Sequence, residues 1–275
     1  MFFSVIMATK NNALYLSDSI DSILNQIFTD WELIIVNDCS TDNTSTILEA
    51  YCHSNKRIRI ITNNVSMGVG HSRNLAISLS IGKWIVVMDG DDACHPTRLT
   101  LLHAAIIRDP TLVLVGSYSI SCNSLMLPQD YLSYPLEHES ILSRLMYSSS
   151  FCLPSCALHR ETVVSLGGYN PALAPADDYD LSIRMSMQGN TANVSEYLYY
   201  YRIHSASLTS IYNTRMLLLS IYIRLKSFIE YGFQFHFFHV LFIILQFLML
   251  LTPTAIRRVA WRTFMRYAPL FSKFF

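Results

Sequence analysis

Short apolar runs alternate with helical segments along residues 1–115, and this alternation limits the possible folds more than any other feature. Runs such as Trp31–Val36 and Trp84–Met88 are largely apolar, which is typical of strands buried on both faces. Between such runs, the apolar positions from Leu16 to Ile27 follow helical spacing. Because parallel strands need long crossover connections, strands separated by helices predict a mostly parallel sheet. The chain is therefore expected to form an α/β domain with helices on both faces of its sheet.

The expected elements can be placed by residue. Strands are expected at Phe2–Ala8, Trp31–Val36, Ile58–Thr62, Trp84–Met88, Leu112–Val115 and Tyr197–Tyr201. Helices are expected at Leu16–Ile27, Thr44–Tyr51, Arg73–Leu79 and Pro96–Ile107, with a further helix beginning near Tyr179. In sheets of this kind, ligands bind beyond the carboxyl ends of the strands. Polar residues that directly follow the predicted strands are therefore the first candidates for a functional site.

The formal net charge of zero conceals two regions of opposite sign. From Asn213 onward the sequence holds eight basic residues and one acidic residue, so residues 1–212 carry an excess of acids. An acidic body is a poor nucleic-acid binder, because duplex binding needs a basic face. A basic and apolar tail suits an anionic membrane surface. We therefore divide the chain into a domain at 1–212, with halves at 1–116 and 117–212, and a helical tail at 213–275.

Acidic residues follow two of the predicted strands. Asp38 comes directly after WELIIVN, and Asp89, Asp91 and Asp92 lie in VVMDGDD. Aspartates at such places can be turn formers or helix N-caps. Three carboxylates within four residues repel one another unless a cation lies between them. An EF-hand loop is excluded because Thr100 stands where its glutamate belongs. The spacing favours a divalent metal shared with a substrate phosphate.

Three other groups are candidates for chemistry. Asp177 and Asp178 precede the helix near Tyr179, where they can cap that helix or supply a general base. Arg73 follows the GVGHS stretch and is either a solvated helix residue or a ligand for diphosphate oxygens. Arg202 and His204, in YYYRIHSAS, have a structural interpretation as well as a functional one.

The six cysteines are expected to be free thiols. The N-terminal MFFSVIMATKNN lacks the basic region and long apolar run of an export signal, which favours a reducing compartment. Cys152, Cys156 and His159 lie close together in the sequence, but no second half-site with metal spacing follows them. A zinc site is therefore not expected.

Five segments in order resemble glycosyltransferase family 2. They are SVIMATKNN, WELIIVNDCSTDNT, GVGHSRNLAISLSIGKWIVVMDGDD, ADDYDLSIRM and YRIHSAS, and the resemblance covers roughly residues 2–207. Each segment alone is a weak signal, whereas five in this order are specific for the family but not for the sugar. The resemblance implies a GT-A fold, a nucleotide-diphosphate sugar donor, a divalent metal and inversion at the anomeric carbon.

The resemblance also implies roles for residues on the donor side. Thr9 and Asn11 would lie against the nucleotide, and Asp38 would accept a hydrogen bond from its base. Asp91 would lie by the ribose and at the metal, and Arg73 would approach the donor phosphates or hold the aspartate loop.

The remaining implied roles concern the metal and the acceptor. Asp89 opens the family's DXD motif, and Asp92 would bind the Mn²⁺ or Mg²⁺ that bridges the diphosphate. Asp178 would be the catalytic base. Arg202 and His204 match a motif on the phosphate side.

The sequence departs from the family pattern at several positions. These are Ala8, Lys10, Asn37, Cys39 and Asp177, where proline, tyrosine, aspartate, glycine and glutamate are more frequent. The first four leave the nucleotide open, with a UDP-sugar favoured. None removes a group with an implied catalytic role.

The leading hypothesis is an inverting transferase that acts on a hydroxyl acceptor in cell-surface polysaccharide or lipid-linked glycan synthesis. A polyprenyl-phosphate glycosyltransferase remains an alternative, because a phosphate acceptor needs little base catalysis. A nucleotidyltransferase is disfavoured, since ATKNNALYL lacks the glycines of the loop that such enzymes use. A nucleotide-binding protein without activity is the remaining alternative.

The tail contains the most apolar stretch of the chain, Phe235–Leu251, followed by IRRVAWRTFMRYA. Arg258, Arg262 and Arg266 are four residues apart, as in a basic amphipathic helix that lies in a membrane interface. The apolar stretch is shorter than the ~20 residues of a spanning helix. Interface binding, packing on the body or a partner, and a true span remain open. The first of these places the protein at the cytoplasmic face of a membrane.

Overall fold

The computed structural model describes residues 1–204, 214–233 and 237–252. Its strands are β1 (Phe3–Thr9), β2 (Trp31–Asn37), β3 (Ile58–Thr62), β4 (Trp84–Asp89), β5 (Ala93–Cys94), β6 (Leu112–Cys122), β7 (Pro128–Leu132), β8 (Ala157–His159) and β9 (Asn190–Arg202). Its α-helices are α1 (Leu16–Leu24), α2 (Thr44–Ser54), α3 (Val69–Leu79), α4 (Arg98–Arg108), α5 (His138–Leu145), α6 (Arg160–Ser165), α7 (Asp177–Ser186), α8 (Thr214–Glu230) and α9 (Phe237–Leu250). Short 3₁₀ turns lie at Leu153–Ser155 and Pro171–Leu173.

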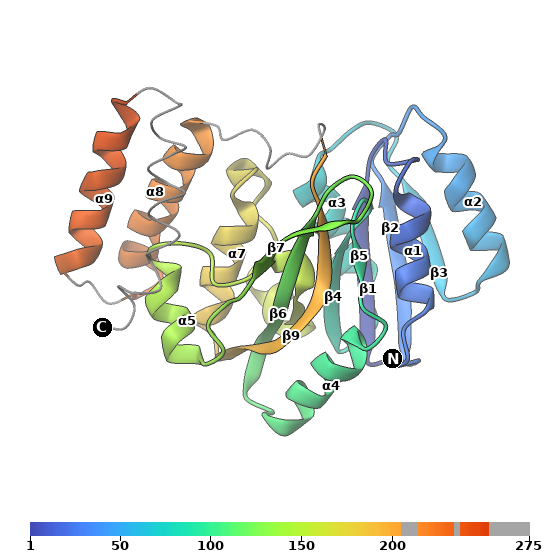
Figure 1. Ribbon diagram of the computed structural model, residues 1–275, viewed down its shortest axis with the longest axis horizontal. Helices are drawn as coiled ribbons and strands as arrows, with labels where there is room; N and C mark the ends of the chain where they lie inside the picture. Colours follow the sequence, from blue (N-terminus) through green and yellow to red (C-terminus); the bar gives the residue numbers. More distant parts are fainter. Residues whose placement is uncertain (205–213, 234–236, 253–275) are drawn as a thin grey trace.

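The described strands form one sheet in the order β3-β2-β1-β4-β8-β6-β9-β5, with β7 paired to β6 (Figure 1). β1 pairs in parallel with β2 and β4, and β2 pairs in parallel with β3. β8 is antiparallel to both β4 and β6, while β6 and β9 are again parallel. The parallel arrangement predicted for the N-terminal half is confirmed. The whole sheet is mixed because β5, β7 and β8 pair antiparallel with their neighbours, and the sequence pattern predicted none of these three short strands.

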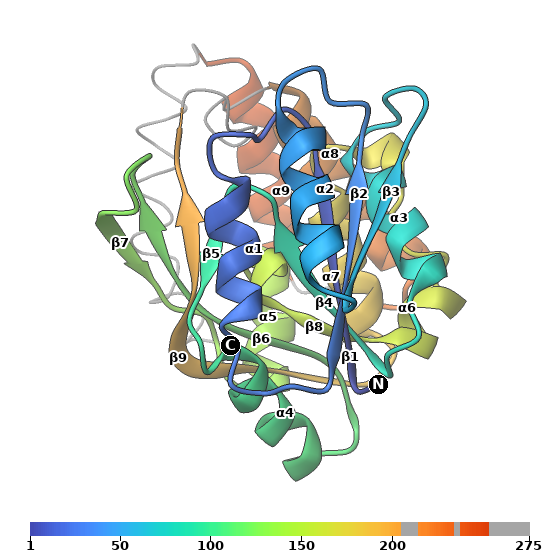
Figure 2. The same ribbon diagram turned by 90° about the vertical axis from the view of Figure 1, so that its right-hand side faces the viewer.

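Alternate side chains of the central strands enter two different cores. Val5 and Met7 of β1 pack in a core shared with α1, α2 and α4, whereas Ile6 packs in a second core with α3, α6 and α7. Figure 2 shows α1 and α2 on one face of the sheet. The side chains of Val5, Ile6 and Met7 are all fully buried. Strands covered on both faces need apolar residues at every position, which is why these segments read as continuous apolar runs.

The structure corrects several expected boundaries. β6 continues to Cys122 instead of ending at Val115, and β9 is longer than the expected Tyr197–Tyr201. Ser117, Ser119 and Ser121 of β6 are buried polar residues whose side chains have hydrogen-bond partners, so an apolar pattern could not find this strand. The fourth helix begins at Arg98 rather than at Pro96.

The C-terminal helices pack on the end of the molecule that lies away from α1 and α2 (Figure 1). Ile223 of α8 belongs to the same core as α5 and α7. The guanidinium of Arg224 donates to the carbonyl oxygens of Met146 and Tyr147, at 2.8 and 3.0 Å, and to Oε1 of Gln246 in α9 at 2.9 Å. These contacts attach α8 and α9 to the body. The arginines at 257, 258, 262 and 266 lie outside the described residues.

Candidate active site

The carboxyl ends of β1, β2 and β4 bring the first candidate residues together. The backbone N–H of Asp38 donates to the carbonyl oxygen of Thr9 at 2.8 Å. A Cβ at Gly90 would lie 2.7 Å from Thr9 Oγ1, so the acidic loop approaches β1 as closely as only glycine permits. Asn11 has a positive φ of 53° and accepts a hydrogen bond from the N–H of Thr41 at 2.8 Å. Thr9 and Asn11 thus lie at the edge predicted from the sequence.

The carboxylate of Asp38 organises the loop that leads into α3. Asp38 is buried and accepts hydrogen bonds from Asn63 Nδ2 at 2.7 Å, Ser66 Oγ at 2.8 Å, and the backbone N–H groups of Met67 and Gly68 at 2.8 and 2.9 Å. Burial by itself raises the pKa of Asp38, but these four donors outweigh it and lower the pKa to about 2. Asp38 is therefore an ionised carboxylate with donors on both oxygens.

The two last aspartates of the acidic loop have different surroundings. Oδ2 of Asp91 lies 2.9 Å from Nε2 of His204. Asp92 is 1% exposed, and its oxygens accept hydrogen bonds from the Tyr199 hydroxyl and the Arg202 backbone N–H, both at 2.7 Å. Asp92 is thereby fixed against β9, whereas Asp91 retains partial exposure. The structure joins Asp91, Asp92, Arg202 and His204 in one cluster.

Negative charge accumulates in this loop. Burial, and then the charge of Asp89, raises the pKa of Asp91, while His204 lowers it. Burial, and then the charges of Asp89 and Asp91, raises the pKa of Asp92 well above its usual range. A divalent cation relieves such repulsion and favours the ionised forms.

The side chains of this loop that could ligate a metal suit a cation that is shared with a substrate. Within the described ranges, no group of three His, Cys, Asp or Glu side chains is arranged to hold a metal by itself. Ions such as Mg²⁺ commonly take one or two carboxylates and complete their shell with water and substrate phosphates. Asp91 with His204 offers one oxygen and one nitrogen at hydrogen-bonding separation.

Arg202 holds the acidic loop against α1. Its Nε donates to the carbonyl oxygen of Asp91 at 2.7 Å, its Nη1 to that of Ser124 at 2.8 Å, and its Nη2 to Asp18 Oδ2 at 2.7 Å. The guanidinium also lies 4.5 Å from the ring centroid of Tyr15. The sequence interpretation missed Asp18 and Tyr15, because a helical aspartate and a tyrosine before a helix carry no distinguishing signal.

The second acidic candidate lies at the first turn of α7. Nη1 of Arg73 donates to Asp178 Oδ1 at 2.7 Å, and Nη2 of the same guanidinium donates to Asp89 Oδ1 at 2.6 Å. Burial raises the pKa of Asp178 to about 6, against the lowering effect of Arg73, and the charges of Asp177 and Asp89 add to the increase. The Asp178 side chain is 35% exposed. It is a carboxylate that solvent can reach and that takes up a proton near neutral pH.

Asp177 lies next to Asp178 but is directed into the protein. It is buried, and its Oδ2 has no hydrogen-bond partner among the described residues. A Cβ at Gly70 would lie 2.8 Å from that oxygen, so α3 and α7 meet closely here. Of the two aspartates, Asp178 is the one whose side chain solvent can reach.

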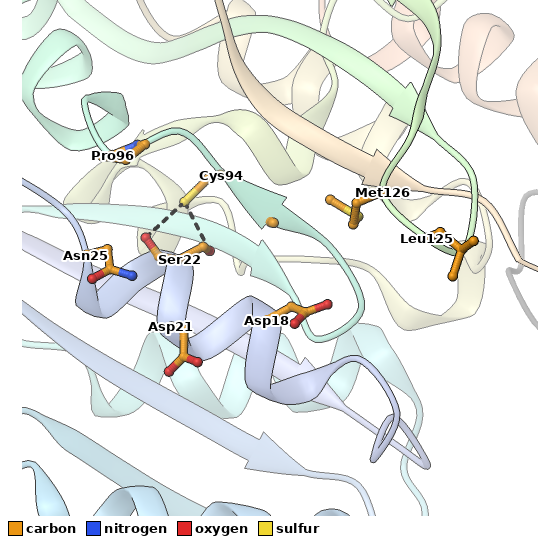
Figure 3. Close-up of a pocket in the computed structure, with 9 residues that line it drawn as sticks. Asp18, Asp21, Ser22, Asn25, Cys94, Pro96, Leu125 and Met126 are labelled. Carbon is orange, nitrogen blue, oxygen red and sulfur yellow. Dashed lines mark hydrogen bonds between the residues drawn. The ribbon is translucent and has the colours of Figure 1, made fainter.

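Clefts next to this cluster lie between α1 and the turn from β6 to β7. One of about 560 Å³ has Asp18, Asp21 and Ser22 of α1, with Asn25 just after it, on one side and Leu125 and Met126 of the turn on the other (Figure 3). A neighbouring cleft of about 430 Å³ is lined by Tyr15, Asp18 and Arg202, among others. Arg202 is the only sequence-predicted site residue that lines either of these two clefts.

The sequence comparison decides the family. The model of the family described as "Glycosyl transferase family 2" matches residues 4–166, which is more than half of the chain.

The chain belongs to glycosyltransferase family 2.

Relatives of this family 2 protein come from several bacteria. The chain is 29% identical over 226 residues to an uncharacterised glycosyltransferase of Haemophilus influenzae, covering 76% of this chain and 68% of the relative. It is 28% identical over 212 residues to the chondroitin synthase of Pasteurella multocida, covering 76% of this chain but 21% of that protein. Over 122 residues it is 32% identical to the Escherichia coli β-1,3-glucosyltransferase WfgD, covering 44% of this chain and 47% of WfgD.

Solved structures share the fold. The Staphylococcus aureus protein TarS, in complex with UDP-GlcNAc, has a TM-score of 0.69 and 23% identity, covering 81% of this chain and 65% of the TarS chain. The mannosyltransferase PcManGT of Pyrobaculum calidifontis, in complex with GDP-Man and Mn²⁺, has a TM-score of 0.64 and 18% identity, covering 83% of this chain and 64% of that one. The expected GT-A fold is confirmed.

The family match ends before several candidate residues. Asp178, Arg202 and His204 lie beyond residue 166, so their roles stay predictions. The geometry links each of them to a residue inside the match, through Arg73 or the acidic loop.

Proposed function

We propose that this family 2 protein is an inverting glycosyltransferase that moves a sugar from a nucleotide-diphosphate donor to an acceptor hydroxyl. The observation that carries the proposal is the pairing of Asp178, a partly exposed carboxylate with a pKa of about 6, with Arg73 beside the acidic loop. A base with a pKa near 6 is largely ionised at neutral pH and still accepts a proton effectively. The acidic loop next to it is suited to a metal–diphosphate group.

On the donor side, we propose that Thr9, Asn11 and Asp38 line the nucleotide. Thr9 Oγ1 is buried and has no hydrogen-bond partner among the described residues, which leaves a hydroxyl available to a ligand. Asp38 already accepts four hydrogen bonds, so contact with a base requires exchange of at least one of them. A UDP-sugar is the favoured donor, and the complex of TarS with UDP-GlcNAc supports this choice.

For the metal, we propose Mn²⁺ or Mg²⁺ held by the acidic loop. The ion would supply Lewis-acid neutralisation of the charge that builds on the departing diphosphate. Asp91 and Asp92 are the predicted ligands, and burial and two hydrogen bonds at Asp92 favour Asp91 as the direct one. Asp92 would then support the loop from behind, and His204 is placed to join Asp91. The Mn²⁺ complex of PcManGT supports a divalent metal.

In the transfer step, Asp178 takes the proton from the acceptor hydroxyl. The hydroxyl oxygen forms a bond to the anomeric carbon as the bond from that carbon to the diphosphate oxygen breaks on the opposite face. The electron pair of the broken bond leaves with the diphosphate, and the configuration is inverted because attack and departure occur on opposite faces of the anomeric carbon. One carboxylate suffices because the leaving group departs as an anion, whereas a glycoside hydrolase needs two.

The acceptor is the least constrained part of the proposal. Chondroitin synthase and WfgD, a glucosyltransferase acting on a diphosphoundecaprenol-linked sugar, support a role in polysaccharide or lipid-linked glycan synthesis. The alternative, transfer to a polyprenyl phosphate, does not need Asp178. A variant Asp178→Asn with unchanged transfer would favour it.

The tail is proposed to bring the enzyme to the cytoplasmic face of a membrane. Along the described chain, helices fall short of the length and apolarity that a membrane crossing needs. α9 buries its polar Gln246 against Arg224 and exposes Leu241, Ile244 and Leu248, by 43, 50 and 54%. A helix with polar residues inward and apolar residues outward suits a lipid interface. The division into a domain at 1–212 and a tail at 213–275 stays a prediction.

A thermal-shift panel tests the donor and metal proposals directly. Each nucleotide sugar is added with and without Mn²⁺, and a ligand that binds only the folded protein raises the melting temperature. We expect the largest shift from a UDP-sugar with Mn²⁺, and its loss in excess chelator. The donor that gives the shift is then used, isotopically labelled, in a transfer assay. Stabilisation by no nucleotide sugar would contradict the proposed function.

A further inference from the structure

Arg73 is the only described residue that contacts both the predicted base and the acidic loop through its side chain. It is 4% exposed and lies on α3, 16 positions from Asp89 and 105 positions from Asp178 in sequence. Its two terminal nitrogens are divided between these carboxylates, at 2.6 Å from Asp89 and 2.7 Å from Asp178. One rigid guanidinium therefore joins the end of β4 to the start of α7.

The Arg73 guanidinium packs near a buried aromatic ring in the loop before α7, and α3 fixes the backbone of that ring's residue. Its carbon lies 5.2 Å from the ring centroid of Tyr169, which is buried. The neighbouring Asn74 fixes the backbone of Tyr169 in both directions, donating to its carbonyl oxygen and accepting from its N–H, each at 2.8 Å. Consecutive residues of α3 thus hold the ring and the cation that packs near it.

We propose that Arg73 is a positioning residue that holds the base Asp178 at a fixed place relative to the donor-binding acidic loop. The inference rests on the proposed function, and it adds a role that differs from direct contact with donor phosphates. Because the planar fork of arginine donates in two fixed directions, it sets the separation of the two carboxylates. A lysine keeps the charge but cannot fork, so it cannot hold both groups in the same geometry.

Arg73 also affects the pKa of Asp178, because other charged groups surround this carboxylate. The titratable groups near Asp178 are Arg73 from α3, Asp89 from the end of β4, Asp177 from α7, the hydroxyl of Tyr169 and the thiol of Cys156. Arg73 is the only cation in this set, and it opposes the effect of burial and of the other carboxylates on the pKa of Asp178. A weaker contact with Arg73 should therefore raise the pH at which the base becomes ionised.

A double-mutant cycle separates this role from a role at the donor. The variants are Arg73→Lys, Asp178→Asn and the pair, with Arg59→Lys as the control, because Arg59 forms an ion pair with Glu32 and contacts none of the site residues. Donor dissociation constants and single-turnover transfer rates are measured for each, with a labelled donor. We expect Arg73→Lys alone to lower the single-turnover transfer rate by about tenfold to a hundredfold, the scale of a misplaced catalytic group. The acidic limb of its pH profile should move to higher pH.

In the Asp178→Asn background, the same Arg73→Lys change should lower transfer by less than about twofold, because residues that act as a unit are not additive. Equal losses in both backgrounds would overturn the positioning role while leaving Asp178 as the base. Full activity of Asp178→Asn would instead refute the base itself. Should Arg73→Lys fail to fold, Tyr169→Leu removes the ring beside the guanidinium. It should cause a smaller loss that Asp178→Asn also suppresses, and an additive loss would overturn the proposal.

Discussion

Two carboxylates of the same site have opposite titration behaviour. Asp38 is buried and Asp178 is partly exposed, and removal from water by itself raises the pKa of each. Four hydrogen-bond donors bring the pKa of Asp38 to about 2, whereas Asp178 has one arginine and two neighbouring carboxylates and stays near 6. Burial is the largest upward effect on both, and the four hydrogen-bond donors of Asp38 reverse it, whereas the single arginine at Asp178 does not.

The variant Asp178→Asn should give the largest effect on transfer. The amide keeps the shape of the side chain but cannot take a proton at neutral pH. Transfer should fall by roughly a hundredfold or more, the scale of a lost general base, with the donor dissociation constant almost unchanged. Isothermal titration with the donor and an initial-rate assay measure the two quantities. A matching loss of donor affinity would mean that Asp178 binds the donor and is not the base.

A pH series tests the same contrast without mutation. Because the folded pKa of Asp178 is raised to about 6, its ionised form is present above that pH and is lost as the pH falls through it. The transfer rate should therefore fall about tenfold per pH unit below 6. Asp38, at about 2, stays ionised throughout that range. A transfer rate that stays constant from pH 7 to 5 would remove Asp178 as the titrating base.

The variant Asp38→Asn should affect stability and donor binding more than chemistry. Its amide nitrogen would face donors that now share the carboxylate, so a hydrogen bond is lost and a donor–donor contact is formed. We expect about 1–3 kcal/mol lower unfolding free energy and several-fold weaker donor affinity. The transfer rate at saturating donor should change little. Denaturant unfolding and kcat measure these outcomes, and Asp130→Asn, at the exposed β7, is the control.

Replacement of Arg257, Arg258, Arg262 and Arg266 by glutamine should give the smallest effect on catalysis. Each arginine near an anionic leaflet contributes about 1 kcal/mol of attraction, which decreases with salt. The variant should therefore float less with anionic liposomes at low salt, while transfer to a water-soluble acceptor is unchanged. Neutral liposomes are the control. Equal flotation of the wild type and the variant in all conditions would contradict an electrostatic attraction between the tail and the membrane. A variant that unfolds would favour packing of the tail on the body.

The sequence by itself determined the N-terminal half of the fold and the family. Strands buried on both faces must be apolar at every position, so β1, β2 and β4 could be located from local composition alone. Their polar ends then identified Asp38 and the acidic loop, because the carboxyl ends of parallel strands meet at one edge. The five family segments added Thr9 and Asn11 by resemblance, and they implied roles for Arg73, Asp178 and His204, which the residues alone had left open.

Only the tertiary structure decided how these residues are paired. β6 was shorter in the sequence interpretation because its buried serines are satisfied by hydrogen bonds that an apolar pattern does not show, such as the one between Ser119 and Tyr134. The ion pair of Arg73 with Asp178 joins residues 105 positions apart, and the Asp18–Arg202 pair joins residues 184 apart. Local patterns report which face of an element is buried, whereas a hydrogen bond between elements depends on where packing places both. That is why most of the site residues were predictable, whereas most of the pairings between them were not.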